Sequence, residues 1–129
     1  ELQWKILQQE KPDDFVIATG QQVSVRDFIN LSLEKLELKV NWEGSGTNER
    51  AVVSKFNINI TPKIKKGDII IAVDEKYFRP AEVDTLLGNS DKAQKLLNWK
   101  PSITLEEMVT EMIDTDLKEA KSASLVSQI

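Results

Sequence analysis

The fold is decided by residues 15–36, FVIATGQQVSVRDFINLSLEKL, which predict a strand, a loop and a helix in that order. The apolar run 15–19 ends at Gly20 and is typical of a buried strand. Ser24 follows as a helix N-cap, with Asp27 three residues later in a capping-box position. The helix then carries one apolar face, made of Val25, Phe28, Ile29, Leu33 and Leu36. A strand that leads into a helix indicates an α/β fold.

Three further strands are predicted after this helix. Residues 38–42 alternate apolar and polar side chains, as a half-buried strand does. Residues 56–60 show the same alternation, and 69–73 form the strongest strand pattern in the sequence. We expect the last two to pair as a hairpin. Residues 45–68 are therefore expected to form a variable loop and hairpin.

Helical patterns flank these strands on both sides. Residues 1–10 are amphipathic and lack a capping residue ahead of them, so we interpret them as a helix cut from a preceding half. Pro80 can begin a short helix that ends at Gly88. Ser90 can begin a second one over residues 91–97, with Ala93, Leu96 and Leu97 inward.

A long helix is predicted after residue 104. Thr104 and Glu107 form a capping box at its start. Its apolar face consists of Leu105, Met108, Val109, Met112, Ile113 and Leu117. Residues 122–129 are small and mostly polar, so we expect a flexible tail there.

The composition argues against several function classes. The chain has 129 residues, 40% of them hydrophobic, which suffices for one domain. Its net charge of -4 argues against nucleic-acid binding, and no run approaches the roughly 18 apolar residues of a membrane span. It has no cysteine and no histidine, which excludes thiolate nucleophiles, imidazole bases and ordinary zinc sites in these residues. No secretory signal is visible, so a cytoplasmic location is expected.

The candidate binding site is the block from Tyr77 to Val83, YFRPAEV. With Pro80 as first helical residue, Arg79 would stand at a helix N-terminus, where free N–H groups and a guanidinium favour phosphate. Glu82, three residues later, could accept hydrogen bonds from sugar hydroxyls. Alternatively, Arg79 is an ordinary surface residue and Glu82 only complements the helix dipole.

A second candidate is Arg26, which follows the predicted strand and loop at a position where ligands often meet α/β sheets. It could face a phosphate, or it could be solvated or ion-paired while Ser24 caps the helix. The three tryptophans (Trp4, Trp42 and Trp99) could stack on a base, although core or subunit packing explains them as well.

Familiar catalytic patterns are missing from these residues. The glycines, at positions 20, 44, 46, 67 and 88, form no G-x-G-x-x-G fingerprint. Tyr77 is the single tyrosine, and Ala81 stands four residues later in place of a lysine. We therefore expect binding, without catalysis, from this segment alone.

Several of these blocks together resemble the GDP-mannose 4,6-dehydratase family. The resemblance begins with QQ (residues 8–9), KPDDFVIATG (11–20) and SVR (24–26). It continues with FRPAEVD (78–84), LLGN (86–89) and LNWKP (97–101), and it runs to the last helix. It covers most of the chain except residues 49–66. The ordered set is more specific than any single block.

The resemblance implies an extended short-chain dehydrogenase/reductase whose N-terminal Rossmann half, which holds tightly bound NADP, is missing. Residues 1–121 would be the C-terminal nucleotide-sugar-binding part, with a small mixed sheet and helices. The complete enzyme would be a lyase of GDP-fucose biosynthesis, converting GDP-mannose to GDP-4-dehydro-6-deoxy-D-mannose, and would form a homodimer or homotetramer. Arg79 matches the family's arginine for the GDP moiety, and Glu82 matches its residue for the ribose of the nucleotide.

Two alternatives remain open at this point. One is a non-catalytic nucleotide-sugar-binding module, and the other is a fragment of a related nucleotide-sugar epimerase or reductase. The catalytic residues and the cofactor glycines of the family have no counterpart in this segment.

Overall fold

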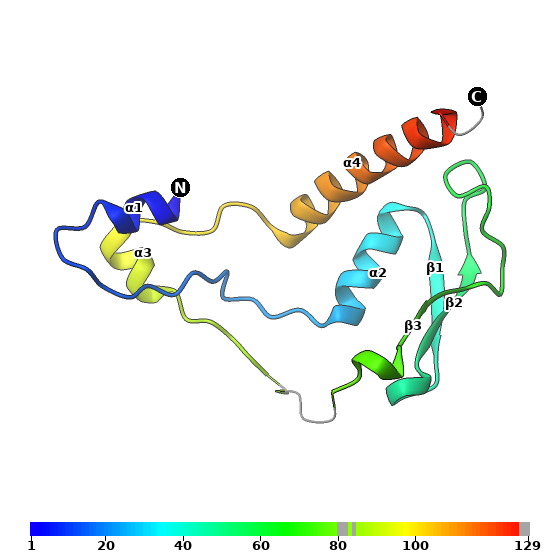
Figure 1. Cartoon of the computed structure of the whole chain (residues 1–129), viewed down its shortest axis with the longest axis horizontal. Coiled ribbons are helices and arrows are strands. Elements are labelled where there is room, and N and C mark those ends of the chain that lie inside the picture. The colour runs from blue at the N-terminus through cyan, green and yellow to red at the C-terminus, as the bar shows by residue number, and fades with distance from the viewer. Residues whose placement is uncertain (80–82, 84, 127–129) are drawn as a thin grey trace. The chain divides into compact units, whose positions relative to one another are not determined.

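A computed structural model describes residues 1–79, 83 and 85–126 (Figure 1). The chain divides into two compact units. The first, which we call the helical unit, consists of Glu1–Val23 and Val83–Thr104. The second, the sheet unit, consists of Ser24–Glu82 and Leu105–Ile129. Among the helices that the structure describes, none combines the length and the apolar composition of a membrane span.

The helical unit is built from two short helices, α1 (Leu2–Leu7) and α3 (Asp91–Leu97). Its core contains Leu2, Ala93 and Leu97, and Ile6, Phe15 and Trp99 pack around them. The Lys5 ammonium donates to the carbonyls of Leu97 and Asn98, at 3.4 and 3.2 Å, where α3 ends. A cation at a helix C-terminus stabilises the exposed carbonyls. The predicted bounds of α3 are confirmed, but Leu96 is 61% exposed and so does not point inward as predicted.

The strand predicted over residues 15–19 is wrong. This segment is irregular, and the side chains of Val16 and Ile17 are 52% and 54% exposed. A strand depends on hydrogen bonds to a neighbouring strand, and no strand of the described residues pairs with this segment. The segment instead runs close to Gly88, where an added Cβ would lie 2.6 Å from the Ala18 Cβ. Gly88 therefore permits this close approach, because it has no Cβ.

The helix predicted from Pro80 to Gly88 is not found among the described residues. Residues 80–82 and 84 lie outside those that the structure describes, and so does the start of this helix. Val83 and residues 85–88 are described and are not helical.

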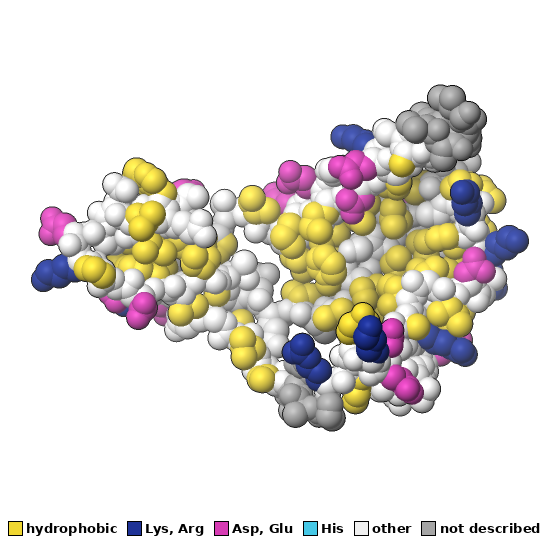
Figure 2. Space-filling view, viewed as in Figure 1, with side chains coloured by type: hydrophobic (Ala, Val, Ile, Leu, Met, Phe, Trp, Pro, Cys, Tyr) yellow, Lys and Arg dark blue, Asp and Glu magenta, His cyan; other side chains and the backbone are white. Residues whose placement is uncertain are grey.

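The sheet unit contains a three-stranded antiparallel sheet in the order β1-β2-β3, where the prediction was a mixed sheet. The strands are β1 (Lys39–Glu43), β2 (Arg50–Lys55) and β3 (Ile69–Ala72). Helix α2 (Val25–Lys35) precedes β1, and α4 (Leu105–Val126) contacts α2. Figure 2 shows hydrophobic side chains gathered where α2, α4 and the sheet meet. The small α/β architecture is confirmed.

The core of the sheet unit lies between α2 and the sheet. Leu33, Leu38 and Val53 are buried there, and six half-buried apolar side chains surround them: Ile29, Leu36, Val40, Phe56, Ile64 and Ile70. The predicted start of α2 is confirmed, because the Asp27 N–H donates to Ser24 Oγ at 3.0 Å. Helix α4 begins where predicted and continues past Ser122 to Val126, so the predicted tail starts too early.

The prediction placed one strand too late in the sequence. The partner of β3 is β2, at Arg50–Lys55, and the predicted strand over residues 56–60 is a series of turns. Asn57 Oδ1 accepts from the Asn59 N–H at 2.9 Å, and the Asn57 carbonyl accepts from the Ile60 and Thr61 N–H groups. An asparagine that bonds the backbone two residues later favours a turn over a strand.

Candidate functional site

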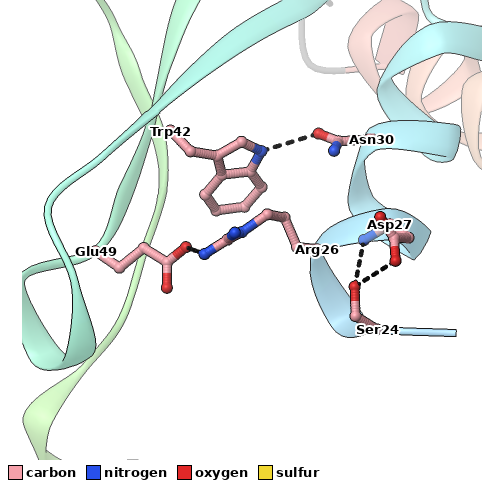
Figure 3. Close-up of polar contacts among 6 residues, drawn as sticks. All are labelled: Ser24, Arg26, Asp27, Asn30, Trp42 and Glu49. Atoms are coloured by element: carbon pink, nitrogen blue, oxygen red, sulfur yellow. Dashed lines mark hydrogen bonds and ion pairs between the residues drawn. The ribbon is translucent and has the colours of Figure 1, made fainter.

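Arg26 lies in the first turn of α2 and is held by two groups of the neighbouring hairpin (Figure 3). Its Nη2 forms an ion pair with Glu49 Oε1, and its guanidinium lies 5.3 Å from the centroid of the Trp42 ring. The side chains of Arg26 and Glu49 are 54% and 20% exposed. Arg26 is thus ion-paired, and its contact with a phosphate stays a prediction. The guanidinium nevertheless remains accessible to a ligand.

The groups around Arg26 are themselves fixed. The indole Nε1–H of Trp42 donates to Asn30 Oδ1 at 3.0 Å, which ties β1 to α2. Ser24 Oγ accepts from the Asp27 N–H and donates to Asp27 Oδ2 at 2.6 Å (Figure 3). A planar guanidinium that stacks on an indole and bonds a carboxylate has few remaining rotamers. Arg26 is therefore a pre-positioned cation at the start of a helix.

Glu49 connects this cluster to the segment that leads to Arg79. The Glu49 carbonyl accepts from the Val73 N–H at 3.0 Å, directly after β3. The chain then forms a short 3-10 helix, Glu75–Tyr77, whose start is capped by Asp74 through a 2.9 Å bond from the Lys76 N–H. Figure 1 shows this green turn at the same end of the sheet as the first residues of α2. Arg26 and the segment before Arg79 thus share one end of the sheet.

Arg79 itself is exposed, and Phe78 before it is 47% exposed. Pro80 and Glu82 lie outside the described residues. The spacing of Arg79 and Glu82 on one helical turn therefore stays a prediction. Arg79 is thus an exposed residue that follows the capped turn Glu75–Tyr77.

Glu49 was not among the predicted site residues. Its contact with Arg26 depends on the β1–β2 hairpin, which returns the chain to the start of α2 after the turn Gly46–Asn48. No local pattern in the sequence marks such a contact. Trp42 was considered for stacking on a base, which stays a prediction, and its ring here faces the Arg26 guanidinium.

The other charged cluster lies in the helical unit. Lys92 Nζ bonds Asp13 Oδ1 at 2.5 Å and the Asp14 carbonyl at 2.9 Å, and it lies 5.1 Å from the centre of the Phe15 ring. The hydrogen bond from Lys92, helped by the Asp14 N–H, lowers the pKa of the Asp13 carboxyl. Both side chains are about half exposed, so this cluster fastens the 13–15 turn to α3. Within the described part of the chain, no group of three or more acidic side chains is arranged to hold a metal ion.

Comparison with known proteins identifies relatives across nearly the whole chain. The family model described as GDP-mannose 4,6 dehydratase matches residues 1–112. A GDP-mannose 4,6-dehydratase of Vibrio cholerae serotype O1 is 51% identical over 127 residues, which are 98% of this chain and 34% of the relative. GDP-mannose 4,6 dehydratase 2 of Caenorhabditis elegans is 46% identical over 91% of this chain and 28% of its own length.

The similarity extends to a human protein. GDP-mannose 4,6 dehydratase of Homo sapiens is 40% identical over 118 residues, which are 92% of this chain and 29% of the relative. The chain therefore spans about a third of the length of the curated relatives that it matches.

Proposed function

The chain belongs to the GDP-mannose 4,6-dehydratase family, and we propose that it forms the nucleotide-sugar-binding part of such an enzyme. The match over 98% of the chain to a relative named GDP-mannose 4,6-dehydratase carries this proposal. The complete protein would be a lyase that converts GDP-mannose to GDP-4-dehydro-6-deoxy-D-mannose. The relatives reported above are named as dehydratases, which favours this reaction over that of an epimerase or a reductase.

Arg79 is proposed to bind the diphosphate of GDP. A guanidinium offers a planar pair of donors that fits phosphate oxygens, and Arg79 is exposed. Glu82 is proposed to accept hydrogen bonds from the ribose hydroxyls, since a carboxylate is an acceptor only. Arg26 is a weaker candidate for the same anion. Its pre-positioned guanidinium at the same end of the sheet supports a role beside Arg79.

NADP is the hydride carrier that the family resemblance implies, and the residues of this chain do not fit it. The five glycines give no dinucleotide fingerprint, and no tyrosine has a lysine four residues later. NADP and the catalytic groups would therefore be supplied by residues outside these 129. A cytoplasmic location and a homodimeric or homotetrameric state are part of the same proposal.

Calorimetric titration of the 129-residue chain with GDP tests the binding role. We expect Arg79→Ala to weaken GDP binding by about 1–3 kcal/mol, the value of a lost hydrogen bond to a charged group. Arg50→Ala is the matched control, because Arg50 is an exposed arginine of the same unit that pairs with Glu43. Equal affinities for wild type and Arg79→Ala would remove Arg79 from the site.

Two further measurements separate the parts of the proposal. Glu82→Gln should reduce the preference of the chain for GDP over its 2′,3′-dideoxy analogue, and an unchanged preference would exclude a ribose contact. The chain incubated with GDP-mannose and NADP should form no 4-dehydro-6-deoxy product. Product formed by the pure chain would overturn the assignment of a binding part without catalytic groups.

A further inference from the structure

Strand β1 has an open edge. Among the described residues, β1 pairs with β2 alone, so its outer edge presents unpaired backbone N–H and C=O groups. A groove of about 850 Å³ adjoins β1 and the end of α2. Its lining includes Asn30, Leu33, Leu38, Val40, Trp42 and Phe56. An edge strand beside a partly apolar groove is a surface to which another strand can add.

The sequence of β1, KVNWE, is complementary to itself in the antiparallel direction. If two copies pair with Asn41 opposite Asn41, Lys39 of each copy lies opposite Glu43 of the other. Val40 then lies opposite Trp42. We propose that a second copy of this chain adds antiparallel to β1 in this register, which joins two three-stranded sheets about a two-fold axis.

The charges within one copy favour this partner. Lys39 lies opposite Lys55 of β2, and like charges directly opposite each other destabilise a sheet. In the described part of the chain, no carboxylate lies within ion-pair distance of Lys39. Arg50 donates two hydrogen bonds to Glu43, from Nε at 3.3 Å and from Nη2 at 2.9 Å, and both go to the Oε2 atom. The Glu43 Oε1 atom can therefore accept from Lys39 of the second copy.

The other face of β1 supplies the apolar contact. Val40 and Trp42 are half-buried, line the groove and alternate with the exposed Lys39, Asn41 and Glu43. Aromatic and β-branched side chains stabilise each other when they lie opposite across two strands. The Trp42 Nε1–H already donates to Asn30, so burying this ring further leaves no unpaired donor.

Analytical ultracentrifugation of the 129-residue chain tests this proposal, which does not depend on nucleotide binding. We expect a concentration-dependent dimer of twice the 14.6 kDa chain mass. Lys39→Glu and Glu43→Lys each replace two attractive pairs with two repulsive ones, and each should weaken dimerisation at least about tenfold. An equimolar mixture of the two variants should recover the dimer, because every carboxylate at position 39 or 43 of one variant then lies opposite an ammonium of the other. The doubly substituted chain, Lys39→Glu with Glu43→Lys, should dimerise like wild type.

Lys63→Glu is the control, because it reverses an exposed charge in the 61–68 turn, away from β1. Circular dichroism of every variant checks that the fold is kept, and the doubly substituted chain keeps the test valid if one single variant unfolds. A monomer throughout the micromolar range would overturn the proposal. The proposal would also be overturned if neither single substitution weakened the dimer, or if the mixture of the two variants failed to form it. A monomer whose β1 amides are protected from hydrogen exchange would show that another segment of the chain fills the groove.

Discussion

Leu96 and Leu97 are neighbours on α3, and replacing each with alanine should have very different effects on stability. Leu97 is 6% exposed and packs with Leu2 and Ala93, whereas Leu96 is 61% exposed. Loss of a buried leucine side chain costs about 2–5 kcal/mol in free energy of unfolding. Three buried residues form the core of the helical unit, so we expect Leu97→Ala to cost about 2–3 kcal/mol, in the lower half of that range. We expect Leu96→Ala to change stability by no more than about 0.5 kcal/mol.

Urea denaturation followed by tryptophan fluorescence measures this difference. Trp99 packs against the same core, so its emission reports on the helical unit. The two variants control for each other, because the same side chain is removed from the same helix with the same change in helix propensity. Equal losses at both positions would refute the packing of α3 against α1, and a larger loss at Leu96 would reverse the buried face of the helix.

Two other predictions concern single residues. The Lys92 ammonium lowers the pKa of Asp13 below its usual 3.8, so the stabilisation by this pair is complete above that value and is lost as pH falls through the lower folded-state pKa. Lys92→Met should raise the pKa of Asp13 toward its usual value in an NMR titration, and an unmoved titration would contradict the pairing. Gly44→Ala should lower stability by more than about 1 kcal/mol, because φ is +78° and the new Cβ would lie 2.2 Å from the Asn48 carbonyl oxygen. Gly67→Ala, at φ +93° with open space around it, should lower the melting temperature less, and a reversed order would contradict the geometry of this turn.

The start of α2 and the end of α3 were predicted correctly because their determinants are local. The hydrogen bond between Ser24 Oγ and the Asp27 N–H starts α2, and Asn98 ends α3 in the left-handed conformation at φ 47°. Both features lie within a few residues of the helix ends that they determine. The α/β class was inferred from a strand over residues 15–19 leading into α2, and it is confirmed although that strand is wrong, because β1, β2 and β3 form the sheet instead.

Strand positions were predicted less well because strands depend on distant partners. Residues 15–19 have the composition of a buried strand, and they remain irregular because no described strand pairs with them. Residues 56–60 alternate apolar and polar side chains as a strand does. The side-chain oxygen of Asn57, however, accepts from the Asn59 N–H, and the chain turns there. The real strand, β2, starts at Arg50, where Ala51 and Val53 provide the inward face. The two adjacent β-branched residues Val52 and Val53 were the sequence feature that could have predicted this strand.

The same distinction applies to the candidate site. The chemistry of Arg26 and Arg79 can be inferred from residue type, because a guanidinium suits phosphate in any fold. The position of Arg26 beside Glu49 cannot be inferred in this way, since it follows from one hairpin. Glu49 bonds Arg26 through its carboxylate and Val73 through its carbonyl, so one residue fixes both the first cation and the start of the segment that carries the second. A change that shifts the β1–β2 turn should therefore disturb both the Arg26 ion pair and the hydrogen bond to Val73, although neither arginine lies in the hairpin. If both arginines bind the same diphosphate, a change in the turn at Gly44–Glu49 should alter the affinity.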